Sequence, residues 1–159
     1  FKKTGKKIII TGVCLNDVSL HYFSYDTTPQ MEILQAITIS ISIPIIFKPH
    51  VYNNKIWVDG GVMNNYPIDI FNDKINDVIG IYLDDEYNTY DVFEDIQSYI
   101  YQVIKCIFRG MNYNKIELYK NNTVHIKTKN VSFGDEMTKE DIELLYKTGY
   151  DEVSTKFNK

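Results

Sequence analysis

The tripeptide Asp59-Gly60-Gly61 is the stretch of this chain whose residue types could do chemistry. Ile56–Val58 is β-branched and aromatic, which predicts a short buried strand that ends at Asp59. A carboxylate at the end of a buried strand needs hydrogen-bond donors or a proton partner, and residues without Cβ let backbone approach it closely. An open α/β sheet presents catalytic groups in this way. Asp-Gly is also a common turn signal, so a simple capping role for Asp59 stays open at this point.

The other residues capable of chemistry do not form a recognisable motif. His21, His50 and His125 are scattered and lack the spacing of metal ligands, so no metal site is expected. Cys14 and Cys106 lie in apolar surroundings without CxxC spacing, which predicts two buried thiols in a reduced, intracellular protein. A disulfide between them is the alternative.

The composition narrows the class of protein. A chain of 159 residues is long enough for one domain with a real core. The net charge of −4, without a basic stripe, argues against a nucleic-acid partner. The most apolar run, Ile37–Phe47, is too short for a membrane span, and no signal peptide opens the chain. We therefore expect a protein of the cytoplasm or the membrane periphery, and the missing initiator Met indicates an internal piece of a longer protein.

Strand patterns recur along the chain and lead toward Asp59. Lys6–Val13 contains a continuous β-branched run of the kind found in parallel sheets, and Ser19–Tyr25 alternates in the manner of a half-exposed strand. Asn53-Asn54 is a two-residue hairpin turn, because Asn tolerates positive φ, and the second arm of this hairpin ends at Asp59. Further strands are predicted at Val78–Leu83 and Thr123–Thr128.

Helix patterns alternate with these strands. Thr28 as N-cap and Pro29 at the first helical position predict one helix, which must end before Pro44. Thr89 is the predicted cap of a long helix that runs through Arg109 and is closed by Gly110. Thr138 and Asp141 are predicted to form the capping box of a last helix, which runs through Phe157. A short helix is predicted at Pro67–Phe71, and the segment Met111–Lys120 is ambiguous. The faces predicted to be buried are Ile33, Leu34, Ile37 and Ile41 in the first helix, Val92, Ile96, Tyr99, Val103 and Ile107 in the second, and Ile142, Leu145 and Tyr146 in the last. The alternation predicts a layered α/β domain with a largely parallel sheet.

The run Ile33–Pro67 resembles the C-terminal half of a patatin-like phospholipase domain. That family has a helix that ends in small residues, then Pro and Phe-x-Pro, a hairpin, and Asp-Gly-Gly followed by Asn and Pro. The corresponding residues here are Ala36, Ser40, Ser42, Pro44, Phe47, Pro49, Asp59, Gly60, Gly61, Asn64, Asn65 and Pro67. The strands at Lys7–Val13 and Val78–Leu83 and the closing segment Ile142–Tyr150 also fit the family's order, so the resemblance covers most of the chain.

The resemblance implies a three-layer α/β fold with a mostly parallel central sheet, and a hydrolase that cleaves acyl esters of lipids. The family uses a Ser-Asp dyad, in which Asp59 would be the base that takes the serine's proton directly. Gly60 and Gly61 would complete the Asp-Gly-Gly loop. Phospholipids or other acyl-ester lipids are the implied substrates, with transient contact to a membrane surface and without a cofactor.

This sequence departs from the family at the nucleophile. No G-x-S-x-G elbow is present, and only Gly5 and Gly12 precede Asp59, so a glycine-rich oxyanion loop is absent as well. The nearest match, Asn130–Gly134 with Ser132, lies on the wrong side of Asp59, and Ser40 and Ser42 are interpreted as small packing residues beside the site. We therefore expect residues 1–159 to be a single partial domain without its N-terminal strands and nucleophile elbow, and inactive alone.

Two other hypotheses remain open from the sequence. One is a non-catalytic lipid-binding or interaction module, for which an exposed Ile45–Phe47 turn would suit contact with lipid chains, although packing in the core is the simpler role of that turn. The other is an inert fragment, because a parallel sheet without its first strands exposes unpaired edges.

Overall fold

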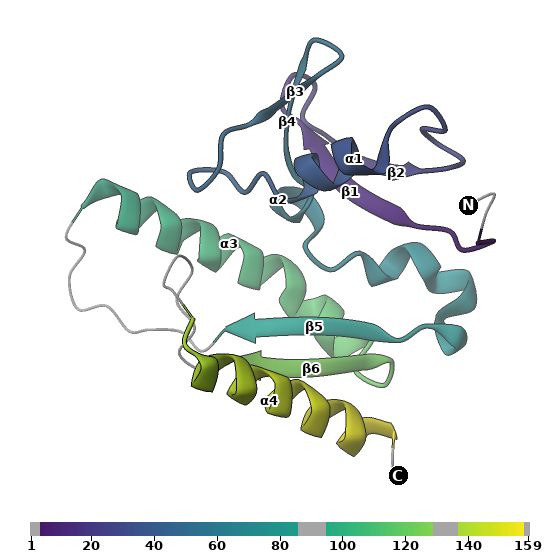
Figure 1. Cartoon of the computed structure of the whole chain (residues 1–159), viewed down its shortest axis with the longest axis vertical. Helices are drawn as coiled ribbons and strands as arrows, with labels where there is room; N and C mark the ends of the chain where they lie inside the picture. The colour runs from purple at the N-terminus through teal and green to yellow at the C-terminus, as the bar shows by residue number, and fades with distance from the viewer. Residues whose placement is uncertain (1–3, 86–94, 129–136, 158–159) are drawn as a thin grey trace. The chain divides into compact units, whose positions relative to one another are not determined.

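The computed structural model of this chain describes residues 4–85, 95–128 and 137–157 (Figure 1). The chain divides into two compact units, which we call unit 1 and unit 2. Unit 1 comprises Phe1–Pro67 and Glu94–Tyr113, and unit 2 comprises Ile68–Phe93 and Asn114–Lys159. The expectation that residues 1–159 form a single partial domain stays a prediction.

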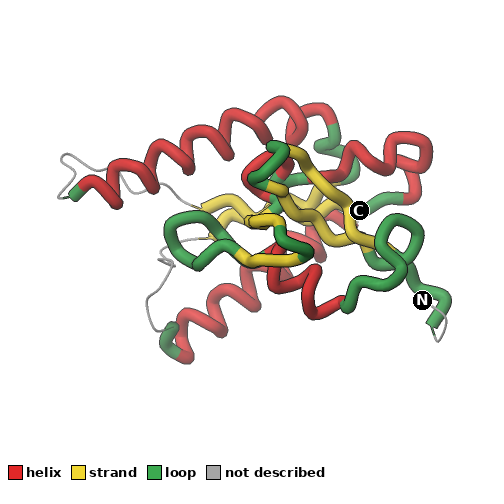
Figure 2. The backbone as a smooth tube through the Cα atoms, turned by 90° about the horizontal axis from the view of Figure 1, so that it is seen from above, coloured by secondary structure: helices red, strands yellow, loops and turns green. Residues whose placement is uncertain are grey.

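Unit 1 is built on a four-stranded sheet with the strand order β2-β1-β4-β3. The strands are β1 (Ile9–Cys14), β2 (Ser19–Ser24), β3 (His50–Tyr52) and β4 (Lys55–Asp59), close to their predicted positions and drawn in yellow in Figure 2. The two central strands, β1 and β4, each have a neighbour on both sides. The site-bearing strand β4 is therefore held by hydrogen bonds along both of its edges.

The direction of the strands in this sheet differs from the prediction of a mostly parallel sheet. All three pairings, β1 with β2, β1 with β4 and β3 with β4, are antiparallel. The short link Leu15–Val18 joins β1 to β2, and a link of that length can only join antiparallel neighbours, because a parallel pair needs a crossover of a dozen residues or more. The β-branched composition of β1 was therefore a poor guide to strand direction.

The hairpin that leads to Asp59 is confirmed. Asn53 and Asn54 have φ values of 51° and 57°, so both residues of the turn adopt the left-handed conformation that this type of hairpin requires. The turn sets the register of β3 against β4, in which Tyr52 lies opposite Lys55. The indole N–H of Trp57 donates to the carbonyl of Tyr52 at 3.1 Å and fastens the two strands together.

One face of this sheet packs against α1 (Ile33–Ser40) to form the core of unit 1. The buried cluster consists of Cys14, Phe23, Ala36, Ile39 and Trp57. Gly12 makes the close approach of the helix feasible, because a Cβ at this position would lie 2.5 Å from Ile39 Cγ2. A larger residue in the middle of β1 would therefore push the helix away from the sheet.

The start and the buried face of α1 correct two predictions. Thr28 does not cap the helix, because its backbone N–H and its hydroxyl both donate to the carbonyl of Ser24, in a turn that follows β2. The N-cap is Glu32, which makes no side-chain capping bond. Ala36 and Ile39 are the buried residues of the helix, whereas the four residues expected inside are exposed: Ile33, Leu34, Ile37 and Ile41.

Unit 2 contains a two-stranded sheet in which β5 (Gly80–Asp85) and β6 (Thr123–Thr128) run parallel. The 3₁₀ segment η1 (Pro67–Asp77) leads into β5, and α4 (Lys139–Phe157) packs on β6 (Figure 1). Among the strand pairs of the described residues, β5 with β6 is the parallel one, and the other three are antiparallel. Both strands and the last helix are confirmed where the sequence placed them, within two residues at their ends.

The long helix α3 (Ile96–Leu118) passes through Gly110 and does not end there. A glycine closes a helix by adopting positive φ, and the one described glycine with positive φ is Gly5. The predicted cap Thr89 and the predicted buried Val92 lie outside the described residues. The other four residues expected to be buried in α3 are exposed: Ile96, Tyr99, Val103 and Ile107.

Helix α4 shows a correct start and an incorrect prediction of burial. The backbone N–H of Thr138 donates to Asp141 Oδ2 at 2.9 Å, and the Asp141 N–H donates to Thr138 Oγ1 at 3.2 Å, which confirms the capping box. No residue of α4 is buried, and Ile142 and Tyr146 are among its exposed side chains. Helical periodicity identifies the apolar face of a helix, but it does not supply the surface that covers that face.

Candidate active site

Asp59 is the last residue of β4, and its backbone is held from two sides. It lies opposite Gly12 in the antiparallel pairing of β4 with β1. Its N–H donates to the carbonyl of Ser42, in the segment that follows α1, at 3.0 Å. The position of the aspartate is therefore set jointly by the central strands and by the end of the helix that packs on them.

Among the residues that the structure describes, the carboxylate of Asp59 has one hydrogen-bond donor. The backbone N–H of Gly61, the first residue of the short helix α2 (Gly61–Asn64), donates to Asp59 Oδ1 at 2.5 Å. No ion pair to Asp59 occurs among the residues that the structure describes. Burial raises the pKa of Asp59 above its ordinary value, and the bond from Gly61 opposes this shift. The group is therefore a half-buried carboxylate with an increased affinity for a proton.

The two glycines after Asp59 are required by close contacts. A Cβ on Gly60 would lie 2.2 Å from Thr11 Oγ1 and 2.7 Å from the Thr11 carbonyl carbon, so β1 and the loop touch through backbone. A Cβ on Gly61 would lie 2.8 Å from Asp59 Oδ1 and 2.7 Å from Asn65 Oδ1. The predicted role of these glycines, in which they allow backbone to approach the carboxylate, agrees with this geometry.

Polar side chains around the loop hold α2 against the sheet. Asn64 Nδ2 donates to the hydroxyl of Tyr22 on β2 at 3.3 Å, and Asn64 is buried. Ser42 is buried as well, and its hydroxyl donates to the carbonyl of Thr38 at 2.7 Å. The small serine therefore packs beside the site, as expected, and its hydroxyl is engaged within its own helical turn.

The structure brings together a serine and a histidine that the sequence analysis did not pair. Ser19 Oγ lies 2.8 Å from His21 Nε2, and it also donates to Asp17, whose other oxygen accepts from Lys55 Nζ at 2.7 Å. The aspartate contacts the serine and not the histidine, so a relay of the serine-protease type is not formed. This network joins the β1–β2 turn to β4. The i, i+2 spacing on one strand face was the signal that could have shown it.

The remaining predicted residues do not add a second site. His50 Nε2 contacts Gln35 Oε1 at 2.8 Å and His125 Nε2 contacts Asp84 Oδ2 at 3.0 Å, so each histidine has a different neighbour. No group of three potential metal ligands occurs within the described ranges. Ser132 lies outside the described residues.

Both cysteines are free, which excludes the disulfide between them. Cys14 is buried as predicted, but Cys106 is exposed, because the face of α3 that carries it is uncovered.

None of the helices in the part of the chain that the structure describes combines the length and the apolar character that crossing a bilayer requires.

Comparison with known proteins shows what the segment around this site is similar to. A family model described as Patatin-like phospholipase matches residues 6–72, which include Asp59. The probable lipid hydrolase 463L of Invertebrate iridescent virus 6 is 50% identical over 70 residues, which is 44% of this chain and 24% of that protein. The uncharacterized protein R571 of Acanthamoeba polyphaga mimivirus is 38% identical over 81 residues, which is 51% of this chain and 27% of that protein. The matches thus span about a quarter of these relatives.

A solved structure extends the likeness of the fold to 96% of the chain. The crystal structure of VipD from Legionella pneumophila aligns with a TM-score of 0.68 over 96% of this chain and 31% of VipD, at 21% identity. The class is therefore a mixed α/β fold shared with VipD. Within residues 6–72, the chain is similar to the patatin-like phospholipase family, and the resemblance seen in the sequence is confirmed for this segment.

Proposed function

We propose that this chain supplies the catalytic aspartate, Asp59, of a patatin-like lipid acyl hydrolase. The observation that supports this role most directly is the state of the carboxylate. It is half-buried, has a raised pKa and is oriented by the Gly61 N–H alone among the described residues. A carboxylate paired with a lysine or arginine would be a weaker base, because the cation favours the charged form.

The proposed chemistry follows from this proton affinity. Asp59 accepts the proton of a serine hydroxyl as the oxygen attacks the ester carbonyl, because serine is a poor nucleophile until a base takes that proton. Asp59 then returns the proton to the departing alcohol, and an acyl-serine remains. In the second half, Asp59 takes a proton from water as the water oxygen attacks the acyl group. The bond to the serine oxygen then breaks, Asp59 returns the proton to that oxygen, and a carboxylic acid is released. The Gly61 N–H keeps the carboxylate in one orientation through both halves.

The serine in this proposal comes from outside the 159 residues. The sequence has no G-x-S-x-G, and Ser132 in Asn130–Gly134 is the nearest approach to that motif. We therefore expect the purified chain to leave a short-chain nitrophenyl ester uncleaved, because a base without its nucleophile can do no acyl transfer. Turnover that is abolished by Asp59→Asn and retained in Ser132→Ala would show that another serine of this chain serves.

The role of Asp59 is tested in a protein that contains the rest of a hydrolase. In a chimera of the viral protein 463L, its patatin-like segment that corresponds to residues 6–72 is replaced by those residues of this chain. We expect the chimera to hydrolyse the ester, and Asp59→Asn in it to lower kcat by about a thousandfold, because the base is lost from the transition state.

The matched control is Asp26→Asn in the same chimera. Asp26 is an exposed carboxylate that pairs with Lys7, so the change in formal charge is the same but the position is unrelated to the site. An active chimera in which Asp59→Asn keeps kcat, or in which Asp26→Asn loses as much, would contradict the proposed role of Asp59. Circular dichroism of each variant establishes that it is folded.

A lipid substrate and transient membrane contact belong to the same proposal. The turn residues Ile45, Ile46 and Phe47 are exposed, which favours contact with lipid chains over the core packing that seemed simpler. The same exposure supports the second candidate function, a non-catalytic lipid-binding module. The module would be favoured if the chimera cleaves no ester but sediments with phospholipid vesicles, and if Ile46→Glu abolishes that sedimentation.

A further inference from the structure

Unit 1 has an apolar groove that is separate from the Asp59 loop. It lies between the first half of β1, the end of β2 and the start of α1, and its volume is about 220 Å³. Its lining residues are Lys6, Ile8, Ile10, Phe23, Ser24, Tyr25, Thr28, Pro29, Met31, Ile33 and Ala36. Neither Asp59 nor its two glycines are among them.

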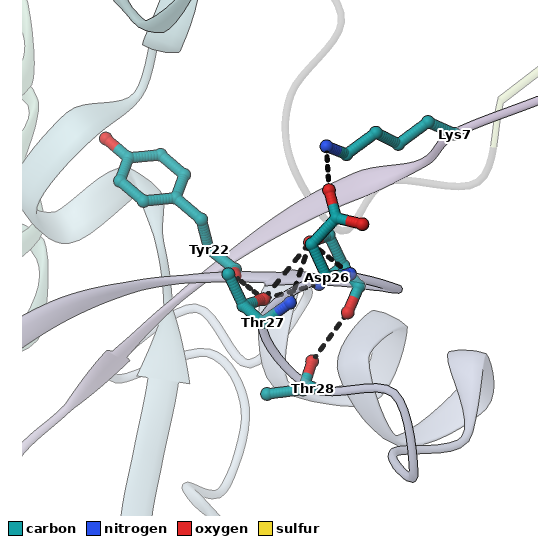
Figure 3. A network of polar contacts seen from close by, with 6 residues as sticks. Lys7, Tyr22, Asp26, Thr27 and Thr28 are labelled. Atoms are coloured by element: carbon teal, nitrogen blue, oxygen red, sulfur yellow. Dashed lines mark hydrogen bonds and ion pairs between the residues drawn. The ribbon is translucent and has the colours of Figure 1, made fainter.

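The hydroxyl groups of Ser24 and Thr28, which line the groove, are already engaged with their own turn (Figure 3). The hydroxyl of Thr28 donates to the carbonyl of Ser24 at 3.3 Å. Ser24 Oγ lies 3.1 Å from Thr27 Oγ1 and accepts from the N–H of Asp26 at 3.2 Å. These groups therefore close the turn after β2, and the walls of the groove act on a ligand mainly as apolar surface.

Two neighbouring lysines at this end of the chain differ in their partners. Lys7 forms an ion pair with Asp26, drawn as a dashed line in Figure 3. Lys6 lines the groove, and within the described ranges its ammonium has no ion-pair partner. The aliphatic stem of a lysine can cover apolar surface while its ammonium stays at the water-exposed rim. Among the described residues, the groove thus combines apolar walls with a positive charge that forms no ion pair.

We propose that this groove binds a single-chain fatty acid, with its hydrocarbon tail between β1 and α1 and its carboxylate at Lys6. One cation matches a ligand with one negative charge. A volume of about 220 Å³ is below the usual range for drug-sized ligands, about 300–1,000 Å³, which favours one chain over a two-chain phospholipid. A fatty acid is what the proposed hydrolase would release, so the choice of ligand rests on the proposed function. The presence of the groove is independent of that function.

The test compares the two lysines in the purified 159-residue chain. Decanoate is titrated below its micelle concentration and followed by calorimetry, with 1-decanol as the ligand of equal length without charge. We expect Lys6→Gln to weaken decanoate binding by about tenfold, because one charge-assisted hydrogen bond is lost. The same variant should leave decanol binding unchanged. The matched control Lys7→Gln, which removes an equal charge next to it, should change decanoate binding by less than about twofold.

A second pair of variants tests the groove wall itself. Ile33 lines the groove and Leu34 does not, although both are exposed on α1 and neither substitution opens the core. Ile33→Glu should abolish decanoate binding, because it places a negative charge in the groove, and Leu34→Glu should retain it. Equal losses in Lys6→Gln and Lys7→Gln, retained binding in Ile33→Glu, or no decanoate binding by the folded wild-type chain would overturn the proposal.

Binding in this groove and catalysis at Asp59 are separable. Asp59→Asn in the purified chain should bind decanoate as the wild type does, since Asp59 does not line the groove. Failure of the chimera to hydrolyse esters would remove the proposed function and leave decanoate binding as an independent result. Loss of decanoate binding with an active chimera would remove the groove proposal alone.

Discussion

Each of the two units carries an aspartate near the carboxyl end of a strand, and the two carboxylates have different neighbours. In unit 2, Asp84 Oδ2 lies 3.0 Å from His125 Nε2 across the β5–β6 pair. In unit 1, Asp59 accepts from a backbone N–H, without a side-chain partner among the described residues. A carboxylate with a facing imidazole can form a stable pair, whereas one that meets only an amide remains able to accept a proton. The contrast shows that position at a strand end does not by itself distinguish the proposed base, Asp59, from a paired carboxylate.

The units also differ in how completely they bury their apolar side chains. Unit 1 has a contiguous buried cluster beneath α1, which includes Ile39. In unit 2, Ile79, Ile81 and Leu83 at and before β5 are all about 60% exposed. The match to the patatin-like family, residues 6–72, falls almost wholly in unit 1. Tight packing and the proposed chemistry therefore coincide in the same part of the chain.

The largest effect that separates the units should come from truncation of one isoleucine in each. Ile39 is 0% exposed, so Ile39→Ala should lower the free energy of unfolding by about 4 kcal/mol through lost burial and a cavity. Ile81 is 60% exposed, so Ile81→Ala should cost less than about 1 kcal/mol. Urea denaturation of both variants measures the difference. Similar costs at the two positions would mean that β5 is covered in solution.

Alanine substitution of one glycine in each unit should change stability with opposite signs. Gly60→Ala places a methyl group 2.2 Å from Thr11 Oγ1 and should destabilise by about 2 kcal/mol or more, because backbone must move. Gly149 lies within α4, and the nearest atom to an added Cβ, Ile126 Cδ1, is 4.0 Å away. Gly149→Ala should therefore stabilise by up to about 1 kcal/mol. Thermal unfolding measures both shifts, and a stabilised Gly60→Ala variant would refute the close contact.

The smallest effect is a pH dependence that also has opposite signs. Burial raises the pKa of Asp59, so the folded state binds its proton up to a higher pH than the unfolded state does, and stability falls as pH rises through that interval. Hydrogen bonds from Thr138 lower the pKa of Asp141, so its contribution is present above the unfolded pKa and is lost as pH falls. Asp59→Asn should thus stabilise more near pH 7 than near pH 4, and Asp141→Asn should destabilise more near pH 7. Melting temperatures at the two pH values measure this, and a pH-independent difference in either variant would contradict its assigned cause.

Local residue chemistry predicted the features that depend on neighbours in sequence. The Asn53-Asn54 turn, the Thr138 capping box and the strand end at Asp59 all follow from side chains acting on adjacent backbone. The expectation that the Asp59 charge must find a donor was met by Gly61, two residues away. The candidate site is therefore predictable as far as the loop itself extends.

Features that depend on distant parts of the chain were predicted poorly. The buried residues of α1 are Ala36 and Ile39. This face packs on the sheet because Gly12 has no side chain and leaves room for Ile39. Periodicity alone favoured the opposite, bulkier face. The ion pair of Lys55 with Asp17, which joins β4 to the β1–β2 turn, likewise spans 38 residues, and no local pattern contains that information. Strand direction could have been inferred from the short β1–β2 link, had the link been weighed above composition.

The difference between the two thiols gives this protein a built-in reporter. Cys106 is accessible in the folded chain and Cys14 is enclosed, so a maleimide dye should attach at one position without any engineering. Global unfolding would bring the number of reactive thiols from one to two. Counting attached dye by mass spectrometry therefore reports the opening of the sheet core that carries the proposed base.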